Sequence, residues 1–174
     1  MEEKIRTLIN INNPAALELI YDHFGPSLFG YLVNFLGNRQ DAEDTMQQLF
    51  ILIARNKHKL LTASNMKAYL FTMARNSAVT LIRKNNKGKD KEPISIEQEL
   101  DASQNKILKE RQESVRAAMY ELPEDQREIV YLKIYNKQTF DSIAKHLNLS
   151  INTVSSRYRY GLQKLKSILL QEND

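Results

Sequence analysis

Residues 139–157 read Thr-Phe-Asp-Ser-Ile-Ala-Lys-His-Leu-Asn-Leu-Ser-Ile-Asn-Thr-Val-Ser-Ser-Arg and contain the most specific local pattern in the chain. Ile143 and Ala144 mark the inner face of a short helix, and Ala144 is small enough for a close helix crossing. Asn148 suits the turn that follows, because asparagine tolerates a left-handed backbone. Ser150 can cap a second helix by accepting a hydrogen bond from a backbone amide. The stretch therefore predicts a helix-turn-helix.

The second of these helices has an apolar side and a polar side. We expect the apolar side to consist of Val154, Tyr158, Leu162, Leu165 and Leu169. At about 100° per residue, the residues that point away from it are Asn152, Ser155, Ser156, Arg159 and Gln163. Paired helices of this kind also occur in proteins that never bind DNA. Here, however, no acidic residue stands between Asp141 and Glu172, and basic residues are frequent, so the sequence favours DNA binding.

The N-terminal half is also helical in pattern. Asn12-Asn13 and Pro14 predict a helix start, and Gly37 predicts its end. Gly25-Pro26 interrupts the apolar period and predicts a kink or a division into two helices. A second helix is expected to open near Asp41. A third is expected to have the following residues facing inward: Met66, Leu70, Met73, Ser77 and Leu81.

The helical pattern fails over residues 86–104, which are polar and charged and include both Gly and Pro. It resumes with an apolar stripe that includes Met119 and Leu122. Pro123 predicts another helix start, and Ile129, Val130 and Leu132 are its expected core side. The fold class that follows is all-α, with two small helical bundles joined by a flexible acidic linker.

Composition excludes several classes of protein. The 174 residues are 42% hydrophobic and 26% charged, with no cysteine, which excludes disulfides and thiolate chemistry. No apolar run is long enough to span a bilayer, and the charged N-terminus does not resemble a signal peptide, so a cytoplasmic protein without its own membrane insertion is expected. His23, His58 and His146 are scattered, so we expect no metal site, no cofactor and no enzymatic activity.

Charge is distributed unevenly along the chain. The net charge is +4 overall, but residues 83–91 carry +4, residues 92–125 carry −5 and residues 126–170 carry +6. Two basic blocks on either side of an acidic one suggest a polyanionic partner that is contacted at two places. An uneven but merely solvated surface would give the same totals.

Four motifs, in order along the chain, resemble those of sigma-70 family RNA polymerase sigma factors. They are Tyr-Asp-His-Phe-Gly-Pro-Ser-Leu-Phe-Gly-Tyr at 21–31, Asp-Ala-Glu-Asp-Thr-Met-Gln-Gln-Leu-Phe at 41–50, Asn-Met-Lys-Ala-Tyr-Leu-Phe-Thr-Met-Ala-Arg-Asn at 65–76 and Leu-Pro-Glu-Asp-Gln-Arg-Glu-Ile-Val at 122–130. With the helix-turn-helix, the likeness covers about residues 14–86 and 106–168. The chain resembles the short extracytoplasmic-function (ECF) type, which keeps regions two and four. The resemblance implies region two at 1–86, a linker at 87–105 and region four at 106–174.

The resemblance also implies functional residues. Those for binding core RNA polymerase are Asp41, Glu43, Asp44, Gln47 and Phe50; the three acids would also suit plain helix capping. Those for the promoter −10 element are Tyr69, Arg75, Asn76, Arg83 and Lys84. In the family, the position of Asn76 contacts a base extruded from the non-template strand, and its amide can both donate and accept; a solvent-facing helix residue is the alternative. Those for the −35 element are Asn152, Thr153, Ser155, Ser156, Arg157, Arg159 and Gln163.

The chain departs from the family pattern in two places. Tyr160, Gly161 and Leu162 stand where basic or small residues are common, and glycine weakens a helix by about 1 kcal/mol. Gln48 stands where the family often has Glu, which makes the polymerase contact less acidic.

The resemblance implies core RNA polymerase, promoter DNA and an anti-sigma factor as partners, the last being membrane-linked in many family members. It also likens the acidic linker to a segment that threads the RNA exit path, although a simple tether has the same composition. The main alternative to the sigma factor interpretation is a stand-alone helix-turn-helix regulator, in which the N-terminal half is a sensor or dimerisation bundle. An enzyme is a more distant one.

Overall fold

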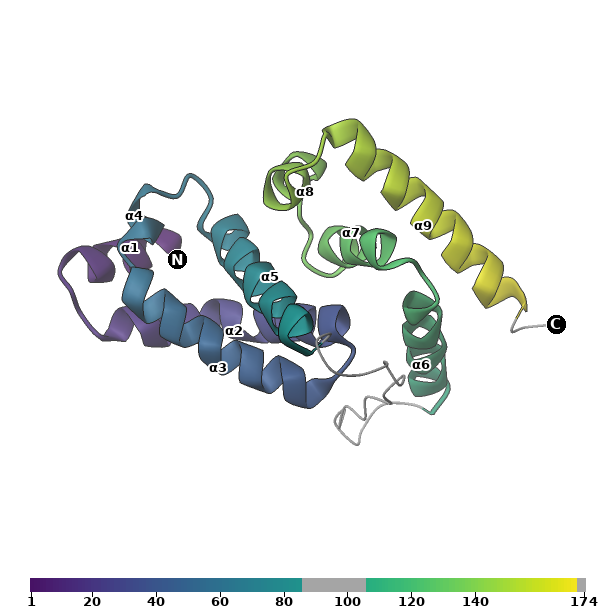
Figure 1. Cartoon of the computed structure of the whole chain (residues 1–174), viewed down its shortest axis with the longest axis horizontal. Helices are drawn as coiled ribbons and strands as arrows, with labels where there is room; N and C mark the ends of the chain where they lie inside the picture. Colours follow the sequence, from purple (N-terminus) through teal and green to yellow (C-terminus); the bar gives the residue numbers. More distant parts are fainter. Residues whose placement is uncertain (86–105, 172–174) are drawn as a thin grey trace. The chain divides into compact units, whose positions relative to one another are not determined.

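A computed structural model describes residues 1–85 and 106–171. The chain divides into two compact units, here called unit one and unit two (Figure 1). The helices of unit one are α1 (Glu2–Asn10), α2 (Ala15–Leu36), α3 (Arg39–Asn56), α4 (Lys59–Thr62) and α5 (Met66–Asn85). Those of unit two are α6 (Lys106–Tyr120), α7 (Glu124–Ile134), α8 (Phe140–Leu147) and α9 (Ile151–Gln171). The predicted linker, 87–105, lies outside the described residues.

Unit one is built on α2, α3 and α5, each of which packs against the other two, while α1 packs against α2 and α4. Its core contains buried aromatic rings. The Tyr31 ring packs edge-on against Phe71, with 5.3 Å between ring centroids, and stacks on Phe35 at 5.7 Å. Such pairs add to the free energy of apolar burial. They fix α5 against the long helix α2.

The turn between α2 and α3 follows the predicted capping chemistry. Gly37 takes a left-handed φ of 71° and its N–H donates to the carbonyl of Val33, ending α2 as predicted. The Asn38 side chain then accepts from the N–H groups of Gln40 and Asp41, so α3 begins at Arg39, two residues before the predicted start.

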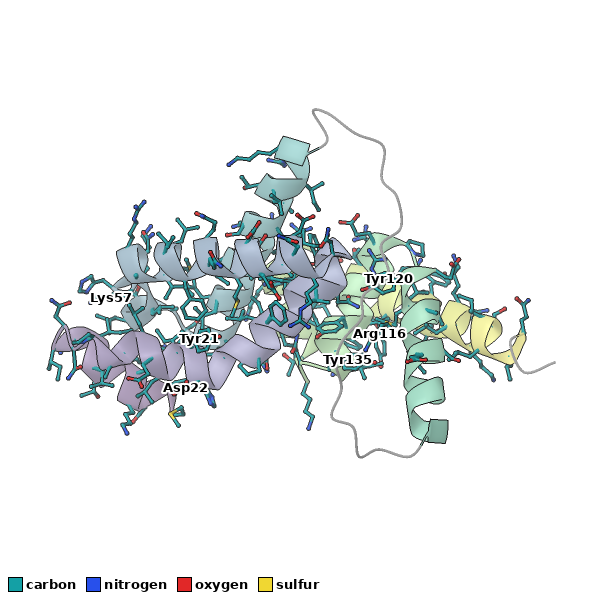
Figure 2. The ribbon with its side chains drawn as sticks, turned by 90° about the horizontal axis from the view of Figure 1, so that it is seen from below. Tyr21, Asp22, Lys57, Arg116, Tyr120 and Tyr135 are labelled. Carbon is teal, nitrogen blue, oxygen red and sulfur yellow. The ribbon has the colours of Figure 1, made fainter. Side chains whose placement is uncertain are left out.

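The sequence predicted a kink or a division of α2 at Gly25-Pro26, and the division is wrong, because α2 runs without a break from Ala15 to Leu36. Proline cannot donate to the carbonyl four residues earlier, which belongs to Asp22. Both Asp22 and Pro26 are exposed, so the missing hydrogen bond falls on the water-facing side of the helix (Figure 2). Water can satisfy that carbonyl.

The predicted inner face of α5 is partly wrong. Met66 and Leu70 are buried as expected, but the face continues through Phe71, Ala74 and Ala78. Met73, Ser77 and Leu81 are half-buried instead. They face a groove between α3 and α5.

In unit two, α9 packs against α6, α7 and α8. Val154 and Leu165 are buried as predicted, but Leu162 is 37% exposed, and the inward position belongs to Gly161. A Cβ on Gly161 would lie 2.9 Å from Val130 Cγ2 and 3.4 Å from Gln126 Cβ. Glycine therefore allows α7 and α9 to approach closely, and this contact compensates its low helix propensity.

Candidate functional site

The groove between α3 and α5 has a volume of about 440 Å³. This lies within the range usual for ligand pockets. One wall comes from α3 and the first residue of α4, and the other comes from α5. The lining residues are Asp44, Thr45, Gln48, Leu52, Asn56, Lys59, Tyr69, Met73, Asn76, Ser77, Thr80, Leu81 and Lys84.

Three of the five residues predicted for the −10 element line this groove, namely Tyr69, Asn76 and Lys84. Tyr69 and Asn76 are seven residues apart on α5, which is nearly two full turns, so they share one face of the helix. The Asn76 side chain is exposed, and the backbone carbonyl of Asn76 accepts a hydrogen bond from Thr80 Oγ1 at 2.7 Å. An aromatic ring, a carboxamide and an ammonium group thus lie along one surface.

The other two predicted residues, Arg75 and Arg83, are not among the groove-lining residues. The guanidinium of Arg75 lies over the Phe35 ring, 5.8 Å from its centroid. Arg83 is exposed in the last turn of α5. Arg83 can reach a phosphate freely, whereas Arg75 is half-buried and held beside α2.

Two hydroxyl groups in the groove are buried without a hydrogen-bond partner among the described residues. They are Thr45 Oγ1 on α3 and Ser77 Oγ on α5. A buried polar atom without a partner costs free energy, so such groups generally serve water or a ligand. These two oxygen atoms have almost no exposed surface, so the exposed Asn76 amide is better placed to meet a polar ligand.

The residues predicted to bind core polymerase lie on more than one side of α3. Asp44 and Gln47 are exposed, and Asp41 is half-buried in the first turn. Glu43 forms an exposed ion pair with Arg39 at 2.9 Å. Phe50 is half-buried, and its ring packs edge-on against Tyr21 of α2, which Figure 2 labels, with 5.2 Å between centroids. The structure thus brings the acids together at one end of α3 and places Phe50 apart from Asp44.

The sequence interpretation missed two exposed apolar residues on α3. Ile51 is 44% exposed and Leu52 is 39% exposed. Ile51 lies one turn beyond Gln47, and Leu52 lies two turns beyond Asp44, both on the outward side of the helix. The signal available in the sequence was that both fall outside the buried stripe of Ala42, Leu49 and Ile53.

The helix-turn-helix forms as predicted. Thr139 Oγ1 accepts from the N–H of Ser142 at the start of α8, and Asn148 takes a left-handed φ of 55° at its end. Ser150 Oγ then accepts from the N–H of Thr153 at 3.0 Å and so caps α9. These local contacts set the direction in which α9 leaves the turn.

The outer face of α9 presents most of the predicted −35 residues. Asn152, Ser155, Arg159 and Gln163 are exposed, and Thr153, Ser156 and Arg157 are half-buried. The two arginines differ in their surroundings. Arg157 forms an ion pair with Asp125 of α7 at 3.0 Å, whereas the Arg159 guanidinium lies 5.2 Å from the centroid of the neighbouring Tyr160 ring. Arg159 is therefore the better placed to project towards base edges.

An aromatic cluster lies where α6 meets α7, and the sequence interpretation did not anticipate it. The rings of Tyr131 and Tyr135 stack with centroids 4.9 Å apart, and Arg127 lies over the Tyr120 ring. Figure 2 labels Tyr120 and Tyr135 of this cluster. Burial raises the pKa of the Tyr131 hydroxyl, and the neighbouring Tyr135 and Tyr120 raise it further. Tyr131 therefore stays neutral. Tyr135 and Ile134 remain about half exposed, at 54% and 46%.

These features define a class of protein, since a helical groove with an exposed amide and a capped helix-turn-helix are both suited to DNA. The Sigma-70 region 2 family model matches residues 20–88, and the Sigma-70, region 4 model matches residues 118–167. The chain belongs to the sigma-70 family of RNA polymerase sigma factors and is of the ECF type. It is a non-enzymatic subunit that directs RNA polymerase to promoters.

Curated relatives of the chain include two ECF sigma factors of similar length. EcfG of Rhodopseudomonas palustris is 27% identical over 144 residues, which cover 83% of this chain and 80% of the relative. RpoE of Cereibacter sphaeroides is 24% identical over 165 residues, which cover 93% and 91%.

Two solved structures share the fold. One is the sigma factor RpoE in complex with the anti-sigma factor NepR from Bartonella quintana, with a TM-score of 0.71, 23% identity, and coverage of 83% of this chain and 90% of that one. The other is CnrH in complex with the cytosolic domain of CnrY, with a TM-score of 0.70, 18% identity and 99% of both chains covered.

Two kinds of site are absent from residues 1–85 and 106–171. No helix there is long and apolar enough to cross a membrane. Nor does this part of the chain bring three or more His, Asp or Glu side chains together in a way that could hold a metal ion.

Proposed function

We propose that the groove between α3 and α5 receives unpaired bases of the −10 element. The proposal is carried by one observation, the placement of Tyr69, Asn76 and Lys84 along a groove of about 440 Å³. The Tyr69 ring stacks on a base, the Asn76 amide hydrogen-bonds its edge, and Lys84 attracts the phosphate backbone. Capture of the base offsets part of the few kcal/mol that unstacking costs. In this assignment region two spans 1–86.

Region four, at 106–174, binds the −35 element through the outer face of α9. Arg159 contacts base edges, supported by its exposure within three turns of the Ser150 cap. Arg157 contacts phosphate, and Asp125 orients it from α7. Asn152, Ser155 and Gln163 contribute further polar contacts along the same face. The remaining residues, 87–105, join the two regions.

Core RNA polymerase binds the acidic N-terminal part of α3. Asp44 and Gln47 are exposed there, and Ile51 adds an apolar contact one turn beyond Gln47. Acids in the first turns of a helix suit a basic partner as well as the helix dipole. Phe50 supports this surface from the side by packing on Tyr21.

An anti-sigma factor regulates the chain in the cytoplasm. The support is that one solved structure of the same fold is the sigma factor RpoE in complex with the anti-sigma factor NepR, and another is CnrH in complex with the cytosolic domain of CnrY. Ile134 and Tyr135 offer an apolar surface on unit two that such a partner can cover. Burial of these residues on addition of a candidate anti-sigma factor can be followed by tyrosine fluorescence. The contribution of Tyr135 is the part of the change that is lost in Tyr135→Phe.

The groove assignment is tested with 2-aminopurine placed at successive −10 positions of a promoter. The holoenzyme is expected to raise fluorescence at the position of the extruded base, and Asn76→Ala is expected to weaken that rise at the same position. An unchanged signal with Asn76→Ala, together with normal polymerase binding, would remove Asn76 from base recognition.

A further inference from the structure

Arg6 on α1 connects two parts of unit one that are more than fifty residues apart in sequence. Its guanidinium donates to the carbonyl oxygens of Leu60 at 2.6 Å, Leu61 at 2.5 Å and Ala63 at 2.5 Å. These carbonyls lie in and just after α4. One side chain thus holds the end of α4 and the first residue of the segment that leads into α5.

The chemistry of this contact requires arginine. The last carbonyls of a helix have no partner within the helix, and a four-residue helix such as α4 is not stable by itself. The guanidinium presents five N–H donors in a fixed plane, so it can satisfy several carbonyls at once, whereas a lysine ammonium acts as a point donor. Ile5 and Ile9, both fully buried, anchor α1 on either side of Arg6.

The segment that Arg6 holds borders the groove. Lys59, in the first turn of α4, lines one end of the groove, and Tyr69, in the first turn of α5, lines it as well. Between them, residues 63–65 form a short connection, and Asn65 Oδ1 caps α5 by accepting from the N–H of Ala68 at 2.9 Å. The position of this connection therefore determines where Lys59 and Tyr69 lie along the groove.

We propose that Arg6 is a positioning residue for −10 recognition. It fixes the α4–α5 connection so that Lys59 and Tyr69 face an unpaired strand in the groove, without contacting DNA itself. This inference rests on the proposed function of the groove. It extends that function to α1, which precedes residues 20–88, where region 2 was matched.

The test uses the full chain assembled with core polymerase and a fluorescent single-stranded oligonucleotide that carries the non-template −10 sequence of a transcribed promoter. Arg6→Lys keeps the charge but loses the planar set of donors. A loss of one or two carbonyl contacts is expected to weaken oligonucleotide affinity about 5–30-fold, which corresponds to about 1–2 kcal/mol. Polymerase affinity and −35 duplex binding are expected to stay unchanged. Lys4→Ala, at an exposed position on the same helix, is the matched control and should leave all three quantities unchanged.

A double-mutant cycle separates positioning from general weakening of the fold. Arg6→Lys is expected to be non-additive with Lys59→Ala, because both act at the same end of the groove, and additive with Lys84→Ala on the last turn of α5. General loss of stability would instead couple equally to both lysines.

Three outcomes overturn the inference. In the first, Arg6→Lys binds the oligonucleotide as tightly as Lys4→Ala does. In the second, Arg6→Lys couples equally to Lys59→Ala and Lys84→Ala. In the third, polymerase affinity and the thermal midpoint fall together with oligonucleotide affinity. If the wild-type holoenzyme itself fails to bind the unpaired oligonucleotide, the groove assignment fails rather than the role of Arg6.

Discussion

In unit one three of the five candidate DNA-contacting side chains line a groove, whereas in unit two the candidates lie on the outer face of a helix. The difference matches the two forms of DNA that a promoter offers. An unpaired base presents a flat face and a free edge that a recess between helices can enclose. Duplex DNA presents its edges inside the major groove, so the protein must project into it.

Among its candidate DNA-contacting residues, each unit has one arginine that a neighbouring helix holds and one that is exposed. Arg75 of unit one lies over Phe35, and Arg157 of unit two is paired with Asp125, so both are held by neighbouring helices. Arg83 and Arg159 are exposed. We infer that the held arginines define fixed points for the phosphate backbone and that the exposed ones adapt to the DNA.

The largest expected effect concerns the packing that supports unit two. Gly161→Leu places a side chain against Val130 and Gln126, where even a Cβ meets Val130 Cγ2 at 2.9 Å. We expect a destabilisation of about 3 kcal/mol, at the upper end for overpacking, with loss of −35 binding and retention of polymerase binding through unit one. Denaturant unfolding and the two binding assays measure this.

Leu162→Ala is the matched control for Gly161→Leu, since Leu162 is the exposed neighbour. It should change stability by no more than about 0.5 kcal/mol. If Leu162→Ala proves the more damaging of the two, then α9 is rotated from the position described here. A loss of polymerase binding in Gly161→Leu would show that the units do not act separately.

The next effect sharpens the role of the groove in unit one. Asn76→Ala should make the free energy of promoter opening less favourable by about 1–3 kcal/mol if the amide contacts a base through two hydrogen bonds. The thermal midpoint and polymerase affinity should stay the same, because an exposed polar side chain contributes little to packing. Permanganate footprinting of the open complex, with Asn10→Ala as an exposed asparagine control, measures the change. A fall in stability without a fall in opening would make Asn76 a structural residue.

A comparable test applies to the helix face of unit two. Arg159→Ala should cost about 1–3 kcal/mol at one −35 position and relax the preference there, as expected for base readout. Arg157→Ala should weaken binding to all sequences alike and reduce the salt slope by about 1, as expected for phosphate contact. Affinity measured over a −35 library at several salt concentrations separates the two. If neither substitution changes −35 preference or affinity, the outer face of α9 is not the DNA surface.

The smallest expected effect concerns the acidic end of α3. Glu43→Gln removes an exposed ion pair with Arg39 and should lower stability by only about 0.3–0.5 kcal/mol. Polymerase affinity should fall more at low salt than at high salt, because exposed charges are screened. Glu121→Gln, an exposed acid on unit two, should not alter polymerase affinity. Equal effects of both substitutions would mean that net charge, rather than this end of α3, governs the interaction.

The sequence was sufficient where structure depends on neighbouring residues. The caps at Gly37, Asn148 and Ser150 and the helix start after Pro123 were predicted correctly, because each depends on contacts within a few residues. The start of α3 was predicted two residues too late, at Asp41 instead of Arg39. This error is also local, because Asn38 is as good a cap as any residue nearer Asp41.

Prediction failed where packing between distant helices decides the outcome. A glycine gives no apolar signal, so the pattern assigned the inward position of α9 to Leu162 rather than to Gly161. The half-burial of Met73, Ser77 and Leu81 depends on where α3 lies beside α5. The sequence could nominate Tyr69, Asn76 and Lys84 individually, but it could not predict the groove that brings them together. It also could not predict the hydrogen bonds from Arg6 to α4 and Ala63, because these join segments that are far apart in the sequence.

Run-off transcription tests the central claim most directly. Core polymerase is incubated with a promoter library, with and without this chain, and duplex binding by the free chain is measured in parallel. We expect initiation at a defined set of promoters only when the chain is present, and weak duplex binding by the chain alone. Tight, specific duplex binding by the free chain, with no initiation after addition of core polymerase, would contradict the account and favour a stand-alone helix-turn-helix regulator.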